Sequence, residues 1–240
     1  MQAVENHKLS RCACCVIRHK GICDALTDAE LMQFSQIATH RSYEPGDIIL
    51  SSDEKTDFFA AIHTGVVKLT KILIDGRQQV VGLLLPPDFL GRAFSKSNPY
   101  FAEAATKVEL CCFPHDKFEH MLDDFSQLKQ RLLEQTLDEL DSTREWMVLL
   151  GRKTAEERVA SLFLMLANRW MKTDCAHQSG QQQEVFELYL KRDEIADFLG
   201  LTYETVCRQI SVLRKSGVVQ FSGTRRFSVP NLDALAEIAG

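Results

Sequence analysis

The sequence LGLTYETVCR, residues 199–208, predicts the turn and the second helix of a helix-turn-helix. Gly200 lies where the chain must turn sharply, and glycine accepts the positive φ that such a turn needs. Thr202 is a good N-cap for the helix that follows. The apolar residues expected to face inward from this helix are Val206, Ile210 and Leu213. A helix of this type lies in the major groove of DNA with its N-terminal residues on base edges, so the stretch predicts a DNA reader.

The residues on both sides of this stretch fit the same motif. Residues 193–199 have the pattern of a short amphipathic helix, whose apolar face consists of Ile195, Ala196 and Leu199. Gly217 is expected to end the second helix, and residues 218–221 and 226–229 have the pattern of two strands around a turn. A hairpin wing after a helix-turn-helix indicates a DNA-binding domain more specifically than either part alone. The alternative interpretation of the two helices is an ordinary packed pair.

The outward face of the predicted recognition helix carries side chains suited to base edges. Arg208 can donate two hydrogen bonds to a guanine, and Glu204 can accept one from a cytosine. The whole chain has a net charge of −5, but residues 191–226 carry seven basic and four acidic side chains. Because DNA affinity depends on local charge, this positive excess fits a DNA-binding surface. The predicted DNA-contacting residues are Thr202, Tyr203, Glu204, Cys207 and Arg208.

The length and composition are typical of a globular protein with two domains. The 240 residues are enough to bury two cores, and the hydrophobic fraction is 45%. No apolar run approaches transmembrane length, and residues 1–12 lack the apolar core of a signal peptide. We therefore expect a cytoplasmic protein without membrane contact. Cytoplasmic thiols stay reduced, so the eight cysteines indicate a metal or redox role rather than structural disulfides.

The N-terminal half has the pattern of an antiparallel β-roll. A capped start at residues 27–30 precedes a short helix over 31–38. Apolar residues then alternate with polar ones, and Asp75-Gly76 is a strong hairpin turn. The predicted strands cover 48–50, 58–63, 66–74 and 79–85. Short strands at such spacing favour a roll or a sandwich.

A long helix is predicted over residues 125–150, which contain neither glycine nor proline. Its apolar positions recur at alternating spacings of three and four, as in a coiled coil. The predicted seam consists of Leu133, Thr136, Leu137, Leu140, Thr143, Met147 and Leu150. We interpret this stripe as a homodimer interface, with packing on its own domain as the alternative. Gly151 is expected to end this helix, and 154–157 to begin the next, which ends near Met171.

The cysteines form a pattern with metal-ligating chemistry. Cys12, Cys15 and Cys23 place three thiols within twelve residues, and the Cys111-Cys112 pair follows far along the chain. Three clustered thiolates and one distant thiolate suit an iron–sulfur cluster or a tetrahedral zinc ion, and the spacing alone leaves both open. A thiol oxidoreductase is a weak alternative because no βαβ unit follows the Cys-x-x-Cys. A haem-based gas sensor with Cys–His ligation is a further alternative.

A β-roll, a long helix and a C-terminal winged helix-turn-helix together resemble the CRP/FNR family of bacterial transcription regulators. Within it, the chain is similar to the alphaproteobacterial type of the FNR branch. Besides the helix-turn-helix, the similarity lies in Gly-Arg-Lys-Thr-Ala-Glu-Glu-Arg, residues 151–158, and in Asp-Phe-Leu-Gly, residues 88–91. The resemblance implies an oxygen-responsive regulator that is not an enzyme, a homodimer on palindromic double-stranded DNA, and RNA polymerase as a partner.

The resemblance also implies an oxygen-labile [4Fe–4S] cluster. In the family its ligands are three N-terminal cysteines and one cysteine in the roll that lies three residues before a proline. Here Pro114 gives that position to Cys111 rather than to Cys112. The implied ligands are Cys12, Cys15, Cys23 and Cys111. Cys14 and Cys112 are additional thiols that could substitute for one of them.

Two further features bear on specificity. The cyclic-nucleotide-binding relatives have an arginine–serine pair in the roll, which is missing from residues 91–105, so we expect no cAMP binding. Cys207 occupies a position where the family often has a serine that meets a thymine, and Tyr203 replaces an arginine of CRP. We expect a TTGAT-N4-ATCAA-like site, with Cys207 against a thymine methyl or acting as a second redox handle.

The expected fold class is α+β, with an N-terminal antiparallel β-roll of the cyclic-nucleotide-binding type, a long dimerisation helix and a C-terminal winged helix-turn-helix. We expect a cysteine-rich cluster-binding arm over residues 1–25 and a β-roll sensor domain over 26–115. The dimerisation helix region would cover 116–150, and the DNA-binding domain 151–240. An intact cluster would pin the arm beside the long helix and favour the dimer that binds DNA under low oxygen.

Overall fold

The computed structural model describes residues 12, 15, 17–173 and 185–240. Cys14 and residues 174–184, most of the polar stretch over 173–184 for which a surface loop is expected, lie outside the described residues. The chain divides into two compact units, of which the first comprises Met1–Arg77 with Val81–Leu140 and the second Gln78–Val80 with Asp141–Gly240. Within the described part, no helix is both long enough and apolar enough to cross a membrane.

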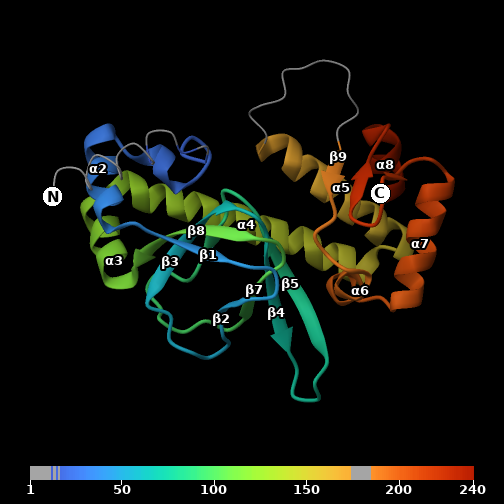
Figure 1. Ribbon diagram of the computed structural model, residues 1–240, viewed down its shortest axis with the longest axis horizontal. Helices are drawn as coiled ribbons and strands as arrows, with labels where there is room; N and C mark the ends of the chain where they lie inside the picture. The colour runs from blue at the N-terminus through green and yellow to red at the C-terminus, as the bar shows by residue number, and fades with distance from the viewer. Residues whose placement is uncertain (1–11, 13–14, 16, 174–184) are drawn as a thin grey trace. The chain divides into compact units, whose positions relative to one another are not determined.

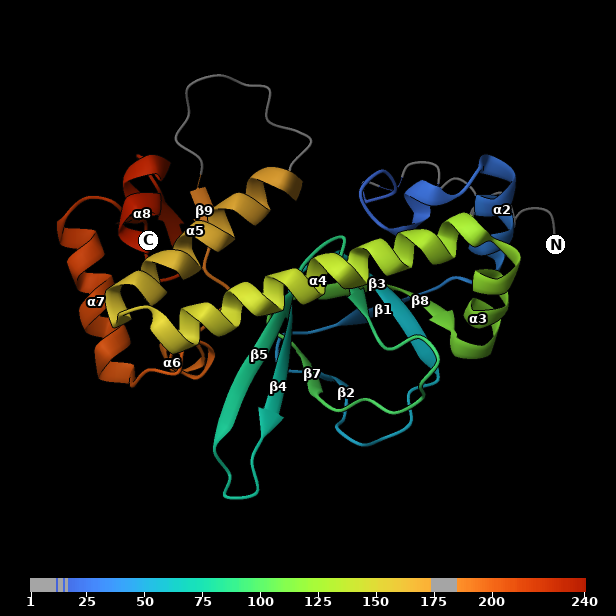
Figure 2. The same cartoon turned by 180° about the vertical axis from the view of Figure 1, so that it is seen from behind.

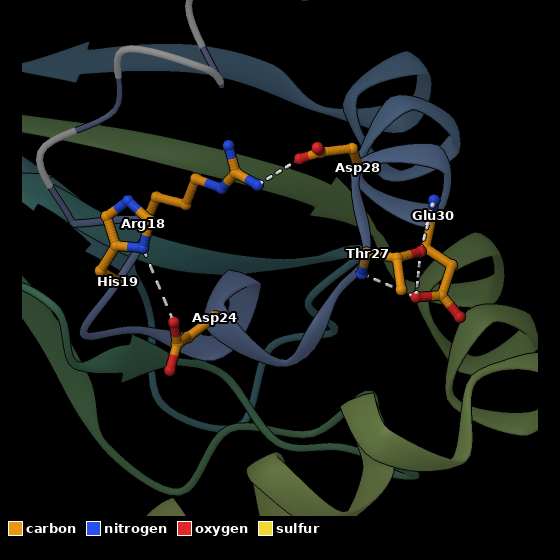
Figure 3. A network of polar contacts seen from close by, with 6 residues as sticks. All are labelled: Arg18, His19, Asp24, Thr27, Asp28 and Glu30. Carbon is orange, nitrogen blue, oxygen red and sulfur yellow. Dashed lines mark hydrogen bonds and ion pairs between the residues drawn. The ribbon is translucent and has the colours of Figure 1, made fainter.

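The first unit begins with the 3₁₀-helix η1 (Ile22–Ala25) and helix α2 (Asp28–Ile37). The predicted capping box is confirmed, because the Thr27 amide donates to Glu30 Oε2 at 2.8 Å and the Glu30 amide donates to Thr27 Oγ1 at 3.3 Å (Figure 3). Such reciprocal bonds satisfy amides that the first helical turn leaves free. Leu31 and Phe34 are the apolar residues that α2 buries.

Two four-stranded antiparallel sheets form the roll, in the orders β1-β8-β3-β6 and β2-β7-β4-β5 (Figure 1). The strands are β1 (Thr39–Tyr43), β2 (Ile48–Leu50), β3 (Phe58–Thr64), β4 (Val67–Ile72), β5 (Gln78–Leu84), β6 (Phe89–Leu90), β7 (Phe101–Ala104) and β8 (Val108–Pro114). The predicted roll is confirmed, and the sequence located β2 to β5 within about two residues of their ends. It missed β1, β6, β7 and β8, of which β6 has only two residues and β8 is largely buried.

Helices α3 (His115–Asp124) and α4 (Ser126–Arg152) follow the roll. The prediction that Gly151 ends the long helix is wrong, because α4 continues to Arg152 and the Lys153 amide still donates to the Leu149 carbonyl at 3.2 Å. A single glycine costs a helix only about 1 kcal/mol, and Gly151 lies within the last turn, one residue before the helix ends.

The second unit contains the predicted winged helix-turn-helix (Figure 2). Its elements are α5 (Ala155–Thr173), β9 (Val185–Glu187), α6 (Arg192–Leu199), α7 (Tyr203–Lys215), β10 (Gln220–Phe221), β11 (Arg226–Ser228) and α8 (Leu232–Ala239). Strands β10 and β11 are the predicted wing, and β9 adds a third strand in the order β10-β11-β9, which was not predicted. Phe163 and Phe227 meet edge to face at 4.9 Å and join α5 to this sheet.

Candidate metal centre and nucleic-acid interface

The arm and the roll form a partly open cavity of about 400 Å³ that the four predicted ligand cysteines line. Cys12, Cys15 and Cys23 come from the arm, and Cys111 comes from β8. Part of the wall is apolar, with contributions from Ile22, Phe34 and Phe113. The structure thus brings together thiols that lie almost a hundred residues apart in the sequence.

Successive tight turns position the thiols of the arm. The Cys15 amide donates to the Cys12 carbonyl at 3.3 Å, and the Gly21 amide donates to the Ile17 carbonyl at 2.9 Å. Ile22 is buried and anchors the arm in the core that contains α2 and α3. A Cβ atom on Gly21 would lie 3.3 Å from Pro87 Cβ, so the arm approaches the roll closely at this residue.

One ion pair connects the described part of the arm with the helix that follows it, and a second lies within the arm (Figure 3). Arg18 Nη2 lies 2.6 Å from Asp28 Oδ1 at the start of α2, and His19 Nδ1 lies 3.8 Å from Asp24 Oδ1. A hydrogen bond also joins the arm to α4, because Arg131 Nη2 donates to the Lys20 carbonyl at 3.3 Å. The arm therefore has a direct polar contact with the long helix.

The strand geometry of β8 separates Cys111 from Cys112. Successive side chains of a strand point to opposite faces of its sheet. Cys112 is 1% exposed and belongs to the core between the two sheets, whereas Cys111 lines the cavity and packs with the arm. Cys111 thus faces the arm cysteines, and Cys112 faces away from them.

The thiols differ in their tendency to ionise. Burial raises the pKa of Cys23 to about 12, with Cys12 and Cys15 adding to the effect, and burial also raises the pKa of Cys111. Burial acts in the same direction on Cys15, but a hydrogen bond from His63 and backbone amides outweighs it and brings the pKa of Cys15 below its ordinary value. Neighbouring thiolates repel one another, so a bound cationic group would favour the deprotonated set.

The donor set and the cavity fit a metal cofactor held by sulfur. Four thiolates are the ligands that iron–sulfur clusters and structural zinc ions take. The residues present therefore have the donor chemistry that either group uses.

Helices α6 and α7 form the predicted helix-turn-helix. Gly200 adopts φ +61° between them, and the Thr205 amide donates to Thr202 Oγ1 at 3.3 Å, which confirms the predicted turn and cap. The turn is tied to α5, because Arg158 Nη1 donates to the Leu199 carbonyl at 3.0 Å. The residues of α7 that point inward are Val206, Ile210 and Leu213, as predicted.

The predicted base-contacting side chains of α7 differ in their exposure to solvent. Tyr203, Glu204 and Arg208 are exposed. Cys207 was expected to point outward, but it is only partly exposed and lines a cavity of about 480 Å³ between α7, the start of α6 and the wing. A hydrogen bond with Cys207 raises the pKa of Tyr203, one turn earlier on the helix. The basic residues around this cavity are Lys191, Arg192, Arg214 and Arg225.

The predicted seam of α4 is an exposed apolar stripe. Leu133, Leu137 and Met147 are 58%, 51% and 68% exposed. Leu140, Thr136 and Thr143 are also exposed, and Leu150 is partly buried. The buried leucines of the helix, Leu128 and Leu149, lie on its other side.

His63 lies in a strand, as the sequence indicated, but the contacts of His63 and Arg131 with the arm were not predicted. His63 lies at the end of β3 and interacts with Cys15, and Arg131 lies on α4 and contacts the arm. No local pattern marks either residue, because each acquires its role through a contact with a distant segment.

Comparisons with known proteins give a consistent result. Residues 40–125 match the cyclic nucleotide-binding domain family, and residues 157–238 match the Crp-like helix-turn-helix domain family. The transcriptional activator protein FnrL of Cereibacter sphaeroides is 45% identical over 232 residues, which cover 97% of this chain and 93% of that protein. The fumarate and nitrate reduction regulatory protein of Escherichia coli is 28% identical, with coverage of 95% and 90%.

The structural comparison agrees. The solved structure of FixK2 from Bradyrhizobium japonicum has a TM-score of 0.75 and 32% identity, and the alignment covers 85% of this chain and 98% of that one. A CooA mutant from Carboxydothermus hydrogenoformans, with a TM-score of 0.67 and 19% identity, shares the fold.

Proposed function

Because the chain belongs to the CRP/FNR family of transcription regulators, in its FnrL-like alphaproteobacterial branch, we propose that it senses oxygen. Its relatives are transcriptional activators, and the chain is a DNA-binding regulator rather than an enzyme. In the proposed function, a [4Fe–4S] cluster favours a homodimer that binds a palindromic TTGAT-N4-ATCAA-like site under low oxygen. The proposal includes a cytoplasmic location, RNA polymerase as the partner and no cAMP as an effector.

The observation that carries the proposal is the cavity lined by Cys12, Cys15, Cys23 and Cys111. These residues would hold the cluster, and the orientation of β8 favours Cys111 over Cys112 as the ligand from the roll. When bound, such a cluster would cross-link the four thiolates, and its loss in oxygen would remove this cross-link. The raised pKa values of Cys23 and Cys111 mean that both thiols return to the neutral form once a cationic group is gone.

The chain's own contacts suggest how the state of the arm reaches the dimer. Arg131 connects the Lys20 carbonyl of the arm to α4, two residues before the exposed stripe begins at Leu133. An arm held by its thiols keeps this carbonyl in place beneath Arg131, whereas a loosened arm does not. A change of only a few kcal/mol in the free energy of dimerisation is enough to shift the population of the dimer substantially.

The apolar stripe of α4 supports a two-fold dimer. Exposed leucines at helical spacing are costly in water and are buried when two copies of the helix pair. A two-fold dimer presents two recognition helices, which matches a palindromic site. In each half-site, Arg208 would read a guanine and Glu204 a cytosine, and Thr202 and Tyr203 at the start of α7 would lie near the bases.

The cavity position of Cys207 weakens the expectation that it touches a thymine methyl directly. Its side chain is partly covered by the hydrogen bond with Tyr203 and by the neighbouring start of α6. We therefore assign the half-site reading to Arg208 and Glu204, with Tyr203 positioned by Cys207.

Iron and sulfide analysis of the anaerobically purified chain tests the cofactor. We expect about four irons and four sulfides per chain, with a brown colour that bleaches in air. Cys111→Ser should abolish the iron content, whereas Cys112→Ala, its neighbour on the opposite face of β8, should retain it. Colourless protein with zinc would instead support a regulator that senses through zinc or thiol–disulfide chemistry, with the same DNA output.

A further inference from the structure

A second cluster of potential metal ligands lies at the start of α3, apart from the cysteine cavity. His115, Asp116 and Glu119 each offer a ligand atom, and these atoms all lie within 4.8 Å of one another. Spacing by one and four residues places all three side chains on the first turns of one helix. One imidazole and two carboxylates form a donor set that first-row divalent metal ions accept.

The imidazole of His115 is the decisive group. His115 is 4% exposed, and its ring stacks on Phe59 with the centroids 4.6 Å apart. Neither ring nitrogen has a hydrogen-bond partner among the described residues. Glu119 Oε1 lies 3.4 Å from His115 Nδ1, close enough for an ion pair but without the alignment of a hydrogen bond. Buried polar atoms are almost always satisfied, so this ring points to a ligand.

The carboxylates already attract a cation. Lys96 Nζ lies 2.8 Å from Asp116 Oδ1, and this contact raises the pKa of Lys96, with Asp57 and Glu119 contributing. The Lys96 side chain is about half exposed and can swing away into water. A metal ion at this place would exchange with an ammonium group that is already drawn there by the same negative charges.

We propose that His115, Asp116 and Glu119 form a binding site for one divalent first-row metal ion, such as Mn²⁺, Fe²⁺ or Zn²⁺. Water completes the coordination on the open side, where Asp116 is exposed. Lys96 competes with the ion for Asp116, and its displacement accompanies binding. The ion thereby satisfies the buried imidazole and stabilises the start of α3.

Titration of the anaerobically purified full-length chain with Mn²⁺ tests the site, with free Mn²⁺ followed by electron paramagnetic resonance. Mn²⁺ prefers oxygen ligands and imidazole to thiolates, so the probe separates this site from the cysteine cavity. We expect saturation at one Mn²⁺ per chain. His115→Gln and Asp116→Asn should each weaken binding about tenfold or more, the scale on which even residues that support metal ligands act.

Two further variants make the result specific. Lys96→Gln removes the competing cation and should tighten Mn²⁺ binding, the opposite direction from the ligand variants. Asp124→Asn removes the same charge from the exposed far end of α3 and should leave the affinity unchanged. Asp116 and Lys96 are exposed, so Asp116→Asn and Lys96→Gln should fold and test the site even if His115→Gln unfolds. Lack of saturable Mn²⁺ binding, or equal affinity of wild type and Asp116→Asn, would overturn the proposal.

Discussion

At the residue scale, the cysteines of this chain differ in chemistry because their surroundings differ. Cys15 receives a hydrogen bond from His63, whereas Cys23 and Cys111 lie in buried positions that disfavour the thiolate. The sequence identified these thiols as a set, since three lie close together in a polar segment. It could not rank them, because His63 reaches Cys15 only through the folded roll.

The ranking can be measured by alkylation of the cluster-free chain at increasing pH. A thiol whose pKa is lowered forms its reactive thiolate at a lower pH, so Cys15 should react with iodoacetamide before Cys12 and Cys23. Cys23, with a pKa of about 12, should stay unreactive through neutral pH. His63→Gln should shift only the Cys15 profile upward. Mass spectrometry that found Cys23 modified first would contradict this account.

The DNA-reading residues also make a prediction at this scale. Arg208→Ala should weaken binding to the palindromic site by about 1–3 kcal/mol and relax the preference at one guanine of each half-site. Competition binding with singly substituted duplexes measures both effects. Arg226→Ala, at the wing, should weaken binding with little change in base preference, as expected for a phosphate contact. An unchanged base preference in Arg208→Ala would mean that α7 does not read the site.

At the element scale, the turn between α6 and α7 depends on the left-handed conformation of Gly200. A Cβ atom there would meet only ordinary contacts, with Arg158 Nη1 at 3.7 Å, so the cost of a side chain is conformational. Gly200→Ala should therefore lower the free energy of unfolding by about 1–2 kcal/mol, and Gly200→Asn by less, because asparagine tolerates this conformation. Urea unfolding measures both values, and equal stability of the three proteins would contradict the assignment.

Helix α4 is the element on which the dimer proposal rests. Leu137→Glu puts a charge into the middle of the exposed apolar stripe and should shift the chain toward monomer in analytical ultracentrifugation. Ser142→Glu adds the same charge at an exposed position on the opposite side of the helix and should leave the dimer intact. If both variants dimerise like the wild type, the stripe is not the seam.

Elements with a strong local signal could be predicted from the sequence, and elements defined by distant partners could not. The helix-turn-helix, the capped α2, strands β2 to β5 and the long helix all have a clear period or a turn residue. Strand β9 is three residues long and exists because it pairs with β11. Strand β8 is largely buried, so its sequence lacks the alternation that marks a half-exposed strand.

At the scale of the whole molecule, three features are connected. Four thiols line one cavity, an arginine of the long helix contacts the arm beside it, and that helix presents an apolar stripe. The cysteine set, the long helix with its apolar stripe and the family of the protein could be predicted from the sequence. The contact of Arg131 with Lys20, which connects the arm to the helix, became visible only in the folded structure.

The coupling predicts that Arg131 matters for more than stability. Arg131→Gln should retain the iron content and should bind the palindromic DNA more weakly than the wild type without oxygen, because the held arm no longer acts on α4. Lys129→Gln, which removes a positive charge two residues away on the same helix, is the matched control. Full DNA affinity of Arg131→Gln would exclude this contact as the link.

The most direct test of the central claim is the affinity for a TTGAT-N4-ATCAA duplex, measured by fluorescence anisotropy with and without oxygen. We expect the wild type to bind tightly in the absence of oxygen and to lose this affinity in air. Cys23→Ala should bind weakly under both conditions, because it lacks one thiol of the cavity. If Cys23→Ala binds as tightly as the anaerobic wild type with and without oxygen, the cysteines do not control DNA binding and the account is wrong.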